Sequence, residues 1–479
     1  MKNNNIIICF ILCLLYIFPS VTGGVYYNDD MFRSIYAYYG WVDDGRPVAE
    51  YIYRSLTMNN LNVIDSFPLL LIIAIGIYCY VCIRVVNNIT DKKGIAVSLA
   101  SCSLIFSPFF ASNLWFRYDS FFMVLSVTSA LYPYSINGSK YKILLIGVIS
   151  LVLCSTLYQP ALSIFICMAS VEIMCLTIRR DANLKSLLSL LVMRISSISI
   201  AVIVYLKIVI PITTAGYYFS NYNKVIDFSY NGIATLYNNY ISAYSIFYLI
   251  LQSPFVVVFL IIAILAALSA IYCIRESKCW YKTLLSIIIC FATIFAFIPG
   301  LGVFSSNMPV FPRTFISLGM ILYAPMLLIA LSNINIRIKY SCLAVVYFYC
   351  FLFFYSSSNA VREEYNNKTM LSSRIIATLD RLGLSSHESF LVDGTASESP
   401  LFNVTAKLYP FLNNMKPNTF WGGYDGGRFM LMRSGMKDIR YPDMDTSSKI
   451  SRKLTDATPL FSSKQFSVFE IDNIVVIKM

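Results

Sequence analysis

The chain has 479 residues, of which 57% are hydrophobic and only 13% charged, and its formal net charge is +12. Soluble domains carry about 25% charged residues, so this chain lacks the polar side chains needed to cover several globular domains. The composition excludes an ordinary soluble enzyme, a disordered chain and a nucleic-acid-binding protein, and it indicates an integral membrane protein.

Long apolar stretches follow one another through the first three quarters of the chain. A membrane-spanning helix needs about 20 mostly apolar residues, and the sequence predicts about eleven such helices. They lie near residues 6–22, 67–83, 95–112, 119–136, 143–158, 161–178, 187–212, 246–273, 283–301, 315–333 and 340–357. The two short stretches beside Gln159-Pro160 form either two spans or one re-entrant hairpin.

The basic residues predict the orientation, because positively charged short loops stay on the cytoplasmic side. With the N-terminus inside, the inner loops hold Arg84, Lys92, Lys93, Lys140, Lys142, Arg179, Arg180, Lys185, Arg275, Lys278, Lys282, Arg337 and Lys339. The outer loops hold only Arg33, Arg46, Arg54, Arg117, Lys224 and Arg313. We therefore expect the tail, residues 358–479, to lie outside.

Residues 1–22 have two interpretations. Lys2, an apolar run and the small residues up to Gly24 are typical of a cleaved signal peptide as well as of a retained signal anchor, and we expect the anchor. All 13 cysteines lie at or before Cys350, in spans or at the inner face. An exterior without cysteine fits an oxidising compartment.

Metal and cofactor chemistry have little support in the sequence. His387 is the only histidine, so neither a Ser/His/Asp triad nor a two-histidine metal site can form. There is no zinc-binding spacing and no nucleotide-binding glycine loop. We expect neither a metal nor a cofactor.

The predicted first outer loop, residues 23–66, concentrates the acidic residues. Its charged residues are Asp29, Asp30, Asp43, Asp44, Glu50 and Asp65 against Arg33, Arg46 and Arg54. The pattern predicts one helix from Asn28 or Asp29 to Tyr39, ended by Gly40, and a second over 47–58 that begins at Pro47. On these helices Asp29 and Arg33, and likewise Glu50 and Arg54, stand four residues apart and share a face.

Taken singly, each of these acids is explained by helix capping or ion pairing. As a cluster, they suit sugar transfer from a lipid phosphate. One carboxylate accepts the proton of the attacking hydroxyl, arginines bind the leaving phosphate, and aromatic rings stack on sugar faces. This chemistry belongs at the edge of a membrane, where the phosphate of such a donor lies.

Two groups of motifs carry a resemblance to a known family. They are Asn28-Asp29-Asp30, Arg33, Trp41 and Gly45-Arg46-Pro47 in the first loop, and Ser107-Pro108 with Phe116-Arg117-Tyr118-Asp119-Ser120 at the next outer corner. With the many-span layout, they resemble the phage-type serotype-converting O-antigen glucosyltransferases, which are polytopic GT-C enzymes. The resemblance implies transfer of glucose from undecaprenyl-phosphate-glucose to the O-antigen repeat, at the periplasmic face of a bacterial inner membrane. It also implies that a first-loop aspartate, Asp30 or else Asp29, is the general base.

Further residues are candidates for substrate binding. In the first loop they are Arg33, Trp41, Arg46 and Glu50, and beyond it Arg117, Asp119, Gln159 and Arg313. We expect Arg117 to hold the lipid phosphate with Asp119 orienting it, and Arg313 to be a second phosphate ligand. A mutual ion pair of Arg117 and Asp119 is the simpler interpretation.

The tail has the composition of a small α/β domain. A helix is predicted over 369–383, a strand over 389–393 and a hairpin over 466–478, with its turn at Asp472-Asn473. The glycine-rich segment around Trp421 and Tyr424 is either a loop of tight turns or a stacking platform for the acceptor sugar.

The predicted fold is thus a polytopic α-helical membrane protein, GT-C-like, with a small exterior C-terminal domain. Its parts are 1–22, 23–66, 67–357 and 358–479. The predicted partners are the lipid-linked glucose donor, the O-antigen acceptor and the bilayer. The alternatives are a GT-C transferase for another sugar and a transporter or flippase of lipid-linked sugars. A transporter is expected to carry its ionisable residues near the midplane, whereas here they gather at one face.

Overall fold

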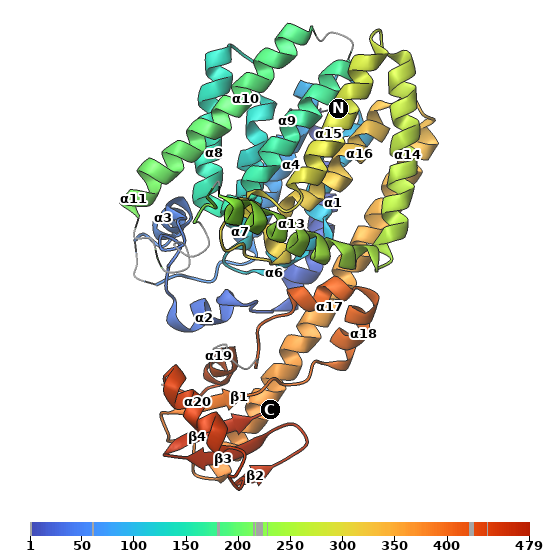
Figure 1. The fold of residues 1–479 in the computed structure, drawn as a ribbon. Coiled ribbons are helices and arrows are strands. Elements are labelled where there is room, and N and C mark those ends of the chain that lie inside the picture. Colours follow the sequence, from blue (N-terminus) through green and yellow to red (C-terminus); the bar gives the residue numbers. More distant parts are fainter. Residues whose placement is uncertain are drawn as a thin grey trace.

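The computed structural model describes residues 2–59, 62–179, 183–213, 216, 224–227, 229–420, 426–437 and 439–479. Long apolar helices form a bundle, and the last part of the chain forms a small sheet with short helices at one end of it (Figure 1). The main bundle helices are α1 (Lys2–Gly23), α4 (Leu69–Ile89), α8 (Lys140–Tyr158), α9 (Leu162–Ile178), α10 (Leu184–Val204), α14 (Phe255–Glu276), α15 (Trp280–Phe297), α16 (Met320–Leu331) and α17 (Ile336–Arg381).

Among the described residues, seven helical stretches are long and apolar enough to cross a membrane. They are Asn4–Gly23, Leu69–Ile89, Lys140–Ile178, Leu184–Ile212, Phe255–Glu276, Trp280–Phe297 and Ile336–Arg381. The stretch Lys140–Ile178 contains two helices, α8 and α9. They are separated where the chain is extended at Tyr158 (φ −161°, ψ 102°), just before the short turn η4 (Gln159–Ala161). The fold is that of a polytopic helical membrane protein, and the count of about eleven spans stays a prediction.

The two stretches expected to span at 95–112 and 119–136 are broken into short pieces in the interior of the bundle. The pieces are α5 (Ile95–Ser101), η1 (Ser103–Phe106), η2 (Pro108–Phe110), α6 (Ala111–Trp115), α7 (Ser120–Leu131) and η3 (Tyr132–Ser135). One break falls at Ser107, whose ψ of 137° is extended, because a residue before proline disfavours the helical region. Asp119 and Arg117 lie in the turn between α6 and α7.

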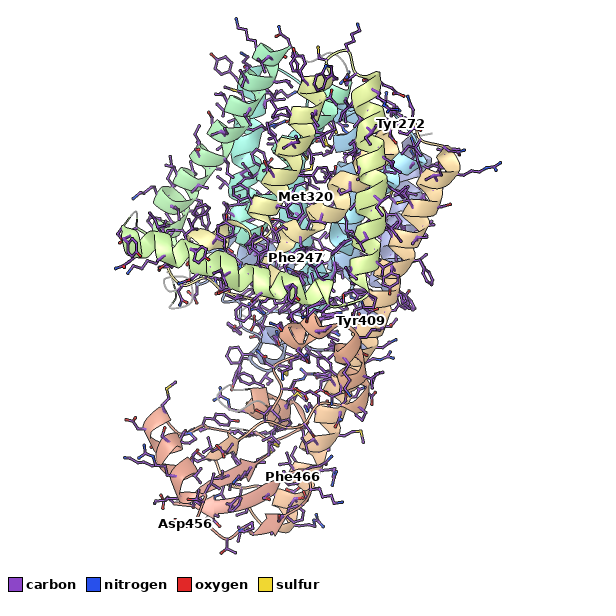
Figure 2. The ribbon with its side chains drawn as sticks, turned by 45° about the vertical axis from the view of Figure 1, so that its right-hand side comes forward. Phe247, Tyr272, Met320, Tyr409, Asp456 and Phe466 are labelled. Carbon is purple, nitrogen blue, oxygen red and sulfur yellow. The ribbon has the colours of Figure 1, made fainter. Side chains whose placement is uncertain are left out.

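The expected span at 246–273 is wrong in its first part. The chain forms two helices here, α13 (Tyr230–Leu251) and α14, separated by a turn at Ser253-Pro254. Helix α13 lies across the end of the bundle, whereas α14 runs along it, as the positions of Phe247 and Tyr272 show (Figure 2). The amide of Asn239 on α13 donates to the carbonyls of Val303 and Ser305, both at 2.8 Å, so α13 anchors the loop that precedes α16.

The predicted helices of the first loop are present as α2 (Asp29–Tyr36) and α3 (Pro47–Leu56). Helix α2 ends three residues before the expected Tyr39, because Ala37 adopts a left-handed conformation with φ 49°. The pair Glu50–Arg54 forms, at 2.8 Å. Helix α2 lies at the end of the bundle that faces the sheet, far from the N-terminus (Figure 1).

The tail begins inside a helix. Helix α17 continues for 46 residues without interruption, so the predicted helix over 369–383 is the end of the last bundle helix, closed at Gly383 with φ +71°. The predicted strands are present as β1 (Phe390–Asp393), β3 (Ser467–Ile471) and β4 (Ile474–Lys478). With the short strand β2 (Phe461–Ser462), which was not predicted, they form a sheet of order β1-β4-β3-β2, in which β1 pairs parallel to β4. The β3–β4 turn is at Asp472-Asn473, both with positive φ.

The remaining tail elements are α18 (Pro400–Leu408), η9 (Pro410–Met415), α19 (Gly426–Arg433) and α20 (Met444–Lys453). The tail packs directly on the first loop. Met31 of α2 is buried in the tail's own apolar core. Arg433 of α19 donates to the hydroxyl of Ser34 and lies 3.6 Å from the ring centre of Tyr26. First loop and tail thus form one body at the same end of the bundle.

A buried ion pair joins α9 to α10 within the bundle. Glu172 accepts from Arg194 Nε at 2.9 Å and Nη2 at 2.7 Å, and the guanidinium stacks 4.2 Å from the ring centre of Tyr134. Because removal of one partner leaves a buried charge, we expect Arg194→Leu to lower stability by about 3–5 kcal/mol. The double variant Arg194→Leu/Glu172→Leu is expected to recover most of that loss, measured as the apparent Tm in detergent. A double variant as unstable as the single one would contradict this account of the pair.

Candidate active site

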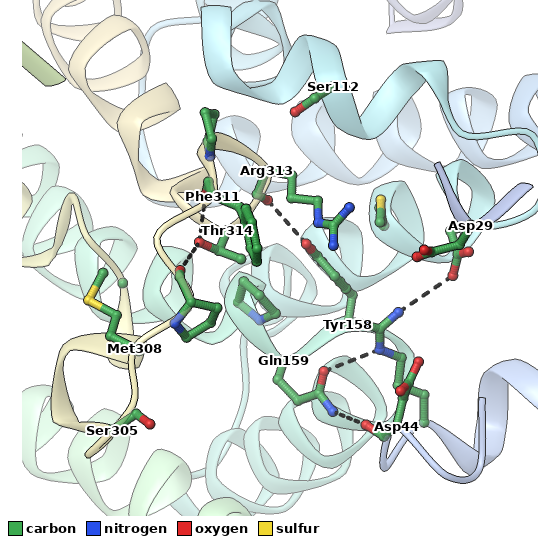
Figure 3. Close-up of a pocket in the computed structure, with 18 of the residues that line it drawn as sticks. Asp29, Asp44, Ser112, Tyr158, Gln159, Ser305, Met308, Phe311, Arg313 and Thr314 are labelled. Carbon is green, nitrogen blue, oxygen red and sulfur yellow. Dashed lines mark hydrogen bonds and ion pairs between the residues drawn. The ribbon is translucent and has the colours of Figure 1, made fainter. Parts of the chain in front are cut away.

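A cavity of about 830 Å³ lies where the first loop, the tail and the ends of several bundle helices meet (Figure 3). Its polar lining residues include Asn28, Asp29, Arg33, Asp44, Arg46, Asp119, Gln159, Arg313, Asn413, Asn414, Lys416 and Asn418. Six of these are residues predicted from the sequence, contributed by α2, the turn before α7, η4 and the loops around Arg46 and Arg313. The fold therefore brings together most of the predicted charged groups.

Asp119 is the centre of the charged network. It precedes α7, is 3% exposed and accepts from the indole Nε1 of Trp41 at 2.7 Å. Arg33 Nε lies 3.7 Å from one of its oxygens and Arg46 Nη1 lies 3.5 Å from the other. Asp119 thus binds two arginines of the first loop and fixes them against the bundle. Arg33 is therefore paired with Asp119 and not with Asp29, which shares its helix face.

Trp41 supports this network from behind the cavity. Its ring is fully buried and stacks on Tyr53 at 5.0 Å, with 5° between the planes. The guanidinium of Arg33 lies 3.8 Å from the centre of the same ring. Trp41 is not among the cavity-lining residues, so its contribution is to position Asp119 and Arg33.

Gln159 ties the loop between α2 and α3 to the bundle. Its amide donates at 2.9 Å to the carbonyl of Asp44 and to the hydroxyl of Tyr205, and it accepts from Arg46 Nε at 3.4 Å. Tyr205 in turn donates to the carbonyl of Gly45 at 2.9 Å. Tyr205 begins the π-helical turn η5 (Tyr205–Val209), which leads from α10 to α11 (Ile210–Ile212).

The two adjacent aspartates of α2 have different environments. The carboxylate of Asp30 is fully buried and accepts backbone N–H groups of Arg117 at 2.7 Å, Tyr27 at 3.2 Å and Tyr118 at 3.3 Å. Burial raises its pKa well above the usual range, while these three N–H groups act in the opposite direction. Asp29 is half-buried and lines the cavity. Within the described residues its carboxylate has no hydrogen-bond or ion-pair partner.

Asp44 is a cavity carboxylate that was not singled out from the sequence. Burial raises the pKa of its carboxyl group, and the charges of Arg46 and Arg33 act in the opposite direction. No local pattern marked Asp44 as a cavity residue, because the hydrogen bond from Gln159 to its carbonyl joins residues 115 positions apart in the chain.

Arg313 enters the cavity from another wall, in the short turn η7 (Pro312–Thr314). The carbonyl of Arg313 accepts from the hydroxyl of Tyr158 and the amide of Asn113, both at 3.1 Å. Its guanidinium lies 5.5 Å from the ring centre of Phe116 and 5.1 Å from that of Phe311. The backbone is thereby fixed, and the half-buried guanidinium lines the same cavity as Asp29 (Figure 3).

Other predicted site residues lie outside the cavity lining. Arg117 binds Asp65 with Nη2 at 2.8 Å and does not pair with Asp119. Glu50 accepts from Arg54 and from the backbone N–H of Val42 at 3.0 Å. Neither Arg117 nor Glu50 lines the cavity. Trp421 and Tyr424 lie outside the described residues.

The tail closes the cavity with residues that sequence reasoning missed. Asn413 and Asn414 of η9, and Lys416 and Asn418 beyond it, line the cavity. The backbone N–H of Asn418 donates to Asn28 Oδ1 at 2.8 Å. No local signal marks these residues, because their role depends on contacts with residues almost 400 positions earlier in the chain.

Among the described residues, one cluster has the spacing of possible metal ligands. It consists of the buried thiols of Cys13, Cys79 and Cys102, which lie within 4.8 Å of one another. None of the three lines the cavity, so the cluster is separate from the candidate active site.

Apolar helices and a charged cavity at one end of the bundle define the class, a polytopic membrane protein with its polar site at one face. The comparison with known families then identifies the group. Residues 18–357 match the family model described as glucosyl transferase GtrII, and the chain belongs to this family. The matched range holds Asp29, Asp119, Gln159 and Arg313, whereas the cavity residues of the tail lie beyond it.

One curated relative is similar to this chain, a protein of Salmonella phage P22 described as an uncharacterized 55.3 kDa protein in the gtrB 5′ region. The two are 26% identical over 258 residues, which is 52% of each chain. The match thus spans about half the length of the curated relative. No solved structure matches the chain.

The contrast between Asp29 and Asp30 predicts that their substitutions lower stability by different amounts. Asp30→Ala leaves three buried backbone N–H groups without their acceptor, so we expect a loss of about 2–4 kcal/mol. Asp29→Ala removes only a half-buried charge at a helix N-terminus and is expected to cost less than about 1 kcal/mol. The apparent Tm of both purified variants in detergent checks this. Equal losses would contradict the structural assignment of Asp30.

Proposed function

We propose that the chain transfers glucose from undecaprenyl-phosphate-glucose to the repeat of a surface polysaccharide, the O antigen, at the periplasmic face of a bacterial inner membrane. The observation that carries the proposal is the cavity itself. In a chain of a glucosyltransferase family, an unpartnered carboxylate, Asp29, and an arginine, Arg313, line one cavity at the end of an apolar bundle. These are the two groups that transfer from a lipid phosphate requires.

Asp29 is the proposed general base. Both first-loop aspartates were candidates, and their surroundings distinguish them, because the oxygens of Asp30 are engaged by three backbone N–H groups. The acceptor hydroxyl oxygen attacks the anomeric carbon of glucose while its proton passes to Asp29. The bond from this carbon to the phosphate oxygen breaks, and the lipid phosphate leaves with the electron pair.

Arg313 is the proposed phosphate ligand. A phosphate leaving group carries its own negative charge, so it needs a cationic hydrogen-bond donor rather than an acid. Arg313 lines the same cavity as Asp29, whereas Arg117, the other predicted phosphate ligand, binds Asp65 and lies outside the cavity lining. In this proposal Arg33, Arg46 and Gln159 shape the cavity and bind sugar hydroxyls, while Trp41, Glu50 and Asp30 position the first loop.

The proposed orientation places the N-terminus in the cytoplasm and the cavity at the periplasmic end of the bundle. The distribution of basic residues supports it, and so does the common position of first loop and tail at one end (Figure 1). In this arrangement residues 1–22 are the first span, 23–66 the first outer loop, 67–357 the remaining bundle and 358–479 the periplasmic domain. The donor then reaches Arg313 from the outer leaflet.

Replacement of the base tests the proposal. We expect Asp29→Asn to lower glucosyl transfer by about 10²- to 10⁴-fold without lowering the amount of protein in the membrane. Transfer is measured as hexose added to the O antigen of a strain that makes the donor. Asp445→Asn, an exposed aspartate of α20, is the matched control. Wild-type levels of hexose with Asp29→Asn would refute Asp29 as the base.

Replacement of the phosphate ligand tests the donor site. Loss of a charge-assisted bond to phosphate is expected to raise the donor KM of Arg313→Ala by about tenfold or more, with Arg313→Lys intermediate. The acceptor KM is expected to stay within about twofold, since uninvolved substitutions change free energies by less than about 0.5 kcal/mol. The measurement is transfer by the purified protein with each substrate varied in turn. A raised acceptor KM at unchanged donor KM would contradict the assignment.

A further inference from the structure

The lining of the cavity divides into two chemically different parts. The end of α10, the turn η5 and the loop before α16 contribute apolar side chains, which are Val202, Leu206, Phe304, Met308 and Phe311. Helix α2 and the tail contribute polar ones, which are Asn28, Asp29, Asn413, Asn414 and Asn418. A cavity that takes one amphiphilic and one fully polar substrate needs such a division, because burying sugar hydroxyls against apolar side chains without hydrogen bonds is costly.

Turn η9 presents two asparagines to the cavity from a fixed base. Phe411, Leu412 and Met415 of this turn are buried to 1% exposure or less, whereas Asn413 and Asn414 between them are exposed. Within the described residues the side-chain amides of these two asparagines have no hydrogen-bond partner. The buried residues of the turn thus fix its position, while in the described part of the chain the side-chain amides of Asn413 and Asn414 make no hydrogen bonds that stabilise the turn itself.

The same turn is fastened to the residues beside the proposed base. The hydroxyl of Tyr27 donates to the carbonyl of Met415 at 2.6 Å, and Asn28 Oδ1 accepts from the N–H of Asn418 at 2.8 Å. Asn28 directly precedes Asp29 in the chain. Any group bound by the turn is therefore held in a fixed relation to the Asp29 carboxylate.

We propose that Asn413 and Asn414, with Asn418 beside them, form the binding site for the acceptor saccharide and determine which acceptor is modified. An asparagine amide offers two donors and one acceptor oxygen, which match the paired hydroxyls of a neutral sugar. The apolar part of the lining takes the polyprenyl end of the donor. This inference rests on the proposed function, and it names the part of the cavity that binds the second substrate.

The extent of the family match supports separate binding sites for the donor and the acceptor. The match covers 18–357, so it includes Asp29 and Arg313 and ends before Asn413. In the proposed reaction the base and the phosphate ligand thus lie in the matched region, whereas the proposed acceptor site lies in the part of the chain beyond it.

The test compares the double variant Asn413→Ala/Asn414→Ala with wild type, using purified full-length protein, undecaprenyl-phosphate-glucose and unmodified O-antigen polysaccharide. Loss of two hydrogen bonds is expected to raise the acceptor KM roughly 10- to 30-fold and to leave the donor KM unchanged. Asn366→Ala, an exposed asparagine of α17 outside the cavity lining, is the matched control and is expected to behave as wild type.

A direct binding measurement accompanies the kinetics. Saturation-transfer NMR with an O-antigen oligosaccharide and no donor is expected to detect binding to wild type and to Asn366→Ala, and weaker binding to the double variant. An unchanged acceptor KM in the double variant, or a donor KM raised as much as the acceptor KM, would overturn the acceptor site while leaving glucosyl transfer established. A wild-type protein that transfers no glucose would instead overturn the proposed function, and the acceptor site with it.

Discussion

The architecture of the site depends on how the protein compensates the charges of two arginines that are largely covered by the fold. Arg33 is 3% exposed, and a buried cation is tolerated only with a paired anion and further hydrogen bonds. Asp119 supplies the anion for both Arg33 and Arg46, at distances of 3.7 and 3.5 Å. Since Asp119 belongs to the bundle and the arginines to the first loop, one carboxylate fixes the loop on the bundle and leaves Asp29 facing the cavity.

A second constraint follows from the apolar bundle. Charged groups are costly inside a membrane, so the polar chemistry collects at one end, where first loop and tail can cover it. The continuous helix α17 carries the tail to this end, and η9 then closes the cavity beside Asn28. The result is a chamber lined by apolar side chains near the bundle and by polar side chains of the first loop and the tail, to which the bundle adds Asp119, Gln159 and Arg313.

Local patterns in the sequence predicted much of this fold. Pro47 marked the start of α3, Asp472-Asn473 marked the β3–β4 turn, and the charged residues around Arg46 and Asp119 were expected at one site. The sequence slightly favoured Asp30 over Asp29 as the base, whereas the proposed base is Asp29. The difference between the two arises from backbone N–H groups of residues 117 and 118, which no local pattern shows. One of the alternative interpretations, a mutual ion pair of Arg117 and Asp119, is wrong, because Arg117 binds Asp65. The position of Asn413 in the cavity lining could not be predicted for the same reason, since it follows from contacts between distant segments.

The most direct test of the account is an experimental structure with a non-transferable analogue of undecaprenyl-phosphate-glucose bound in a lipid environment. The account predicts the phosphate at the guanidinium of Arg313, the polyprenyl chain along Leu206 and Phe311, and the anomeric carbon within reach of a hydroxyl held by Asp29. A phosphate bound at Arg117, or a glucosyl group outside the cavity between first loop and tail, would contradict it.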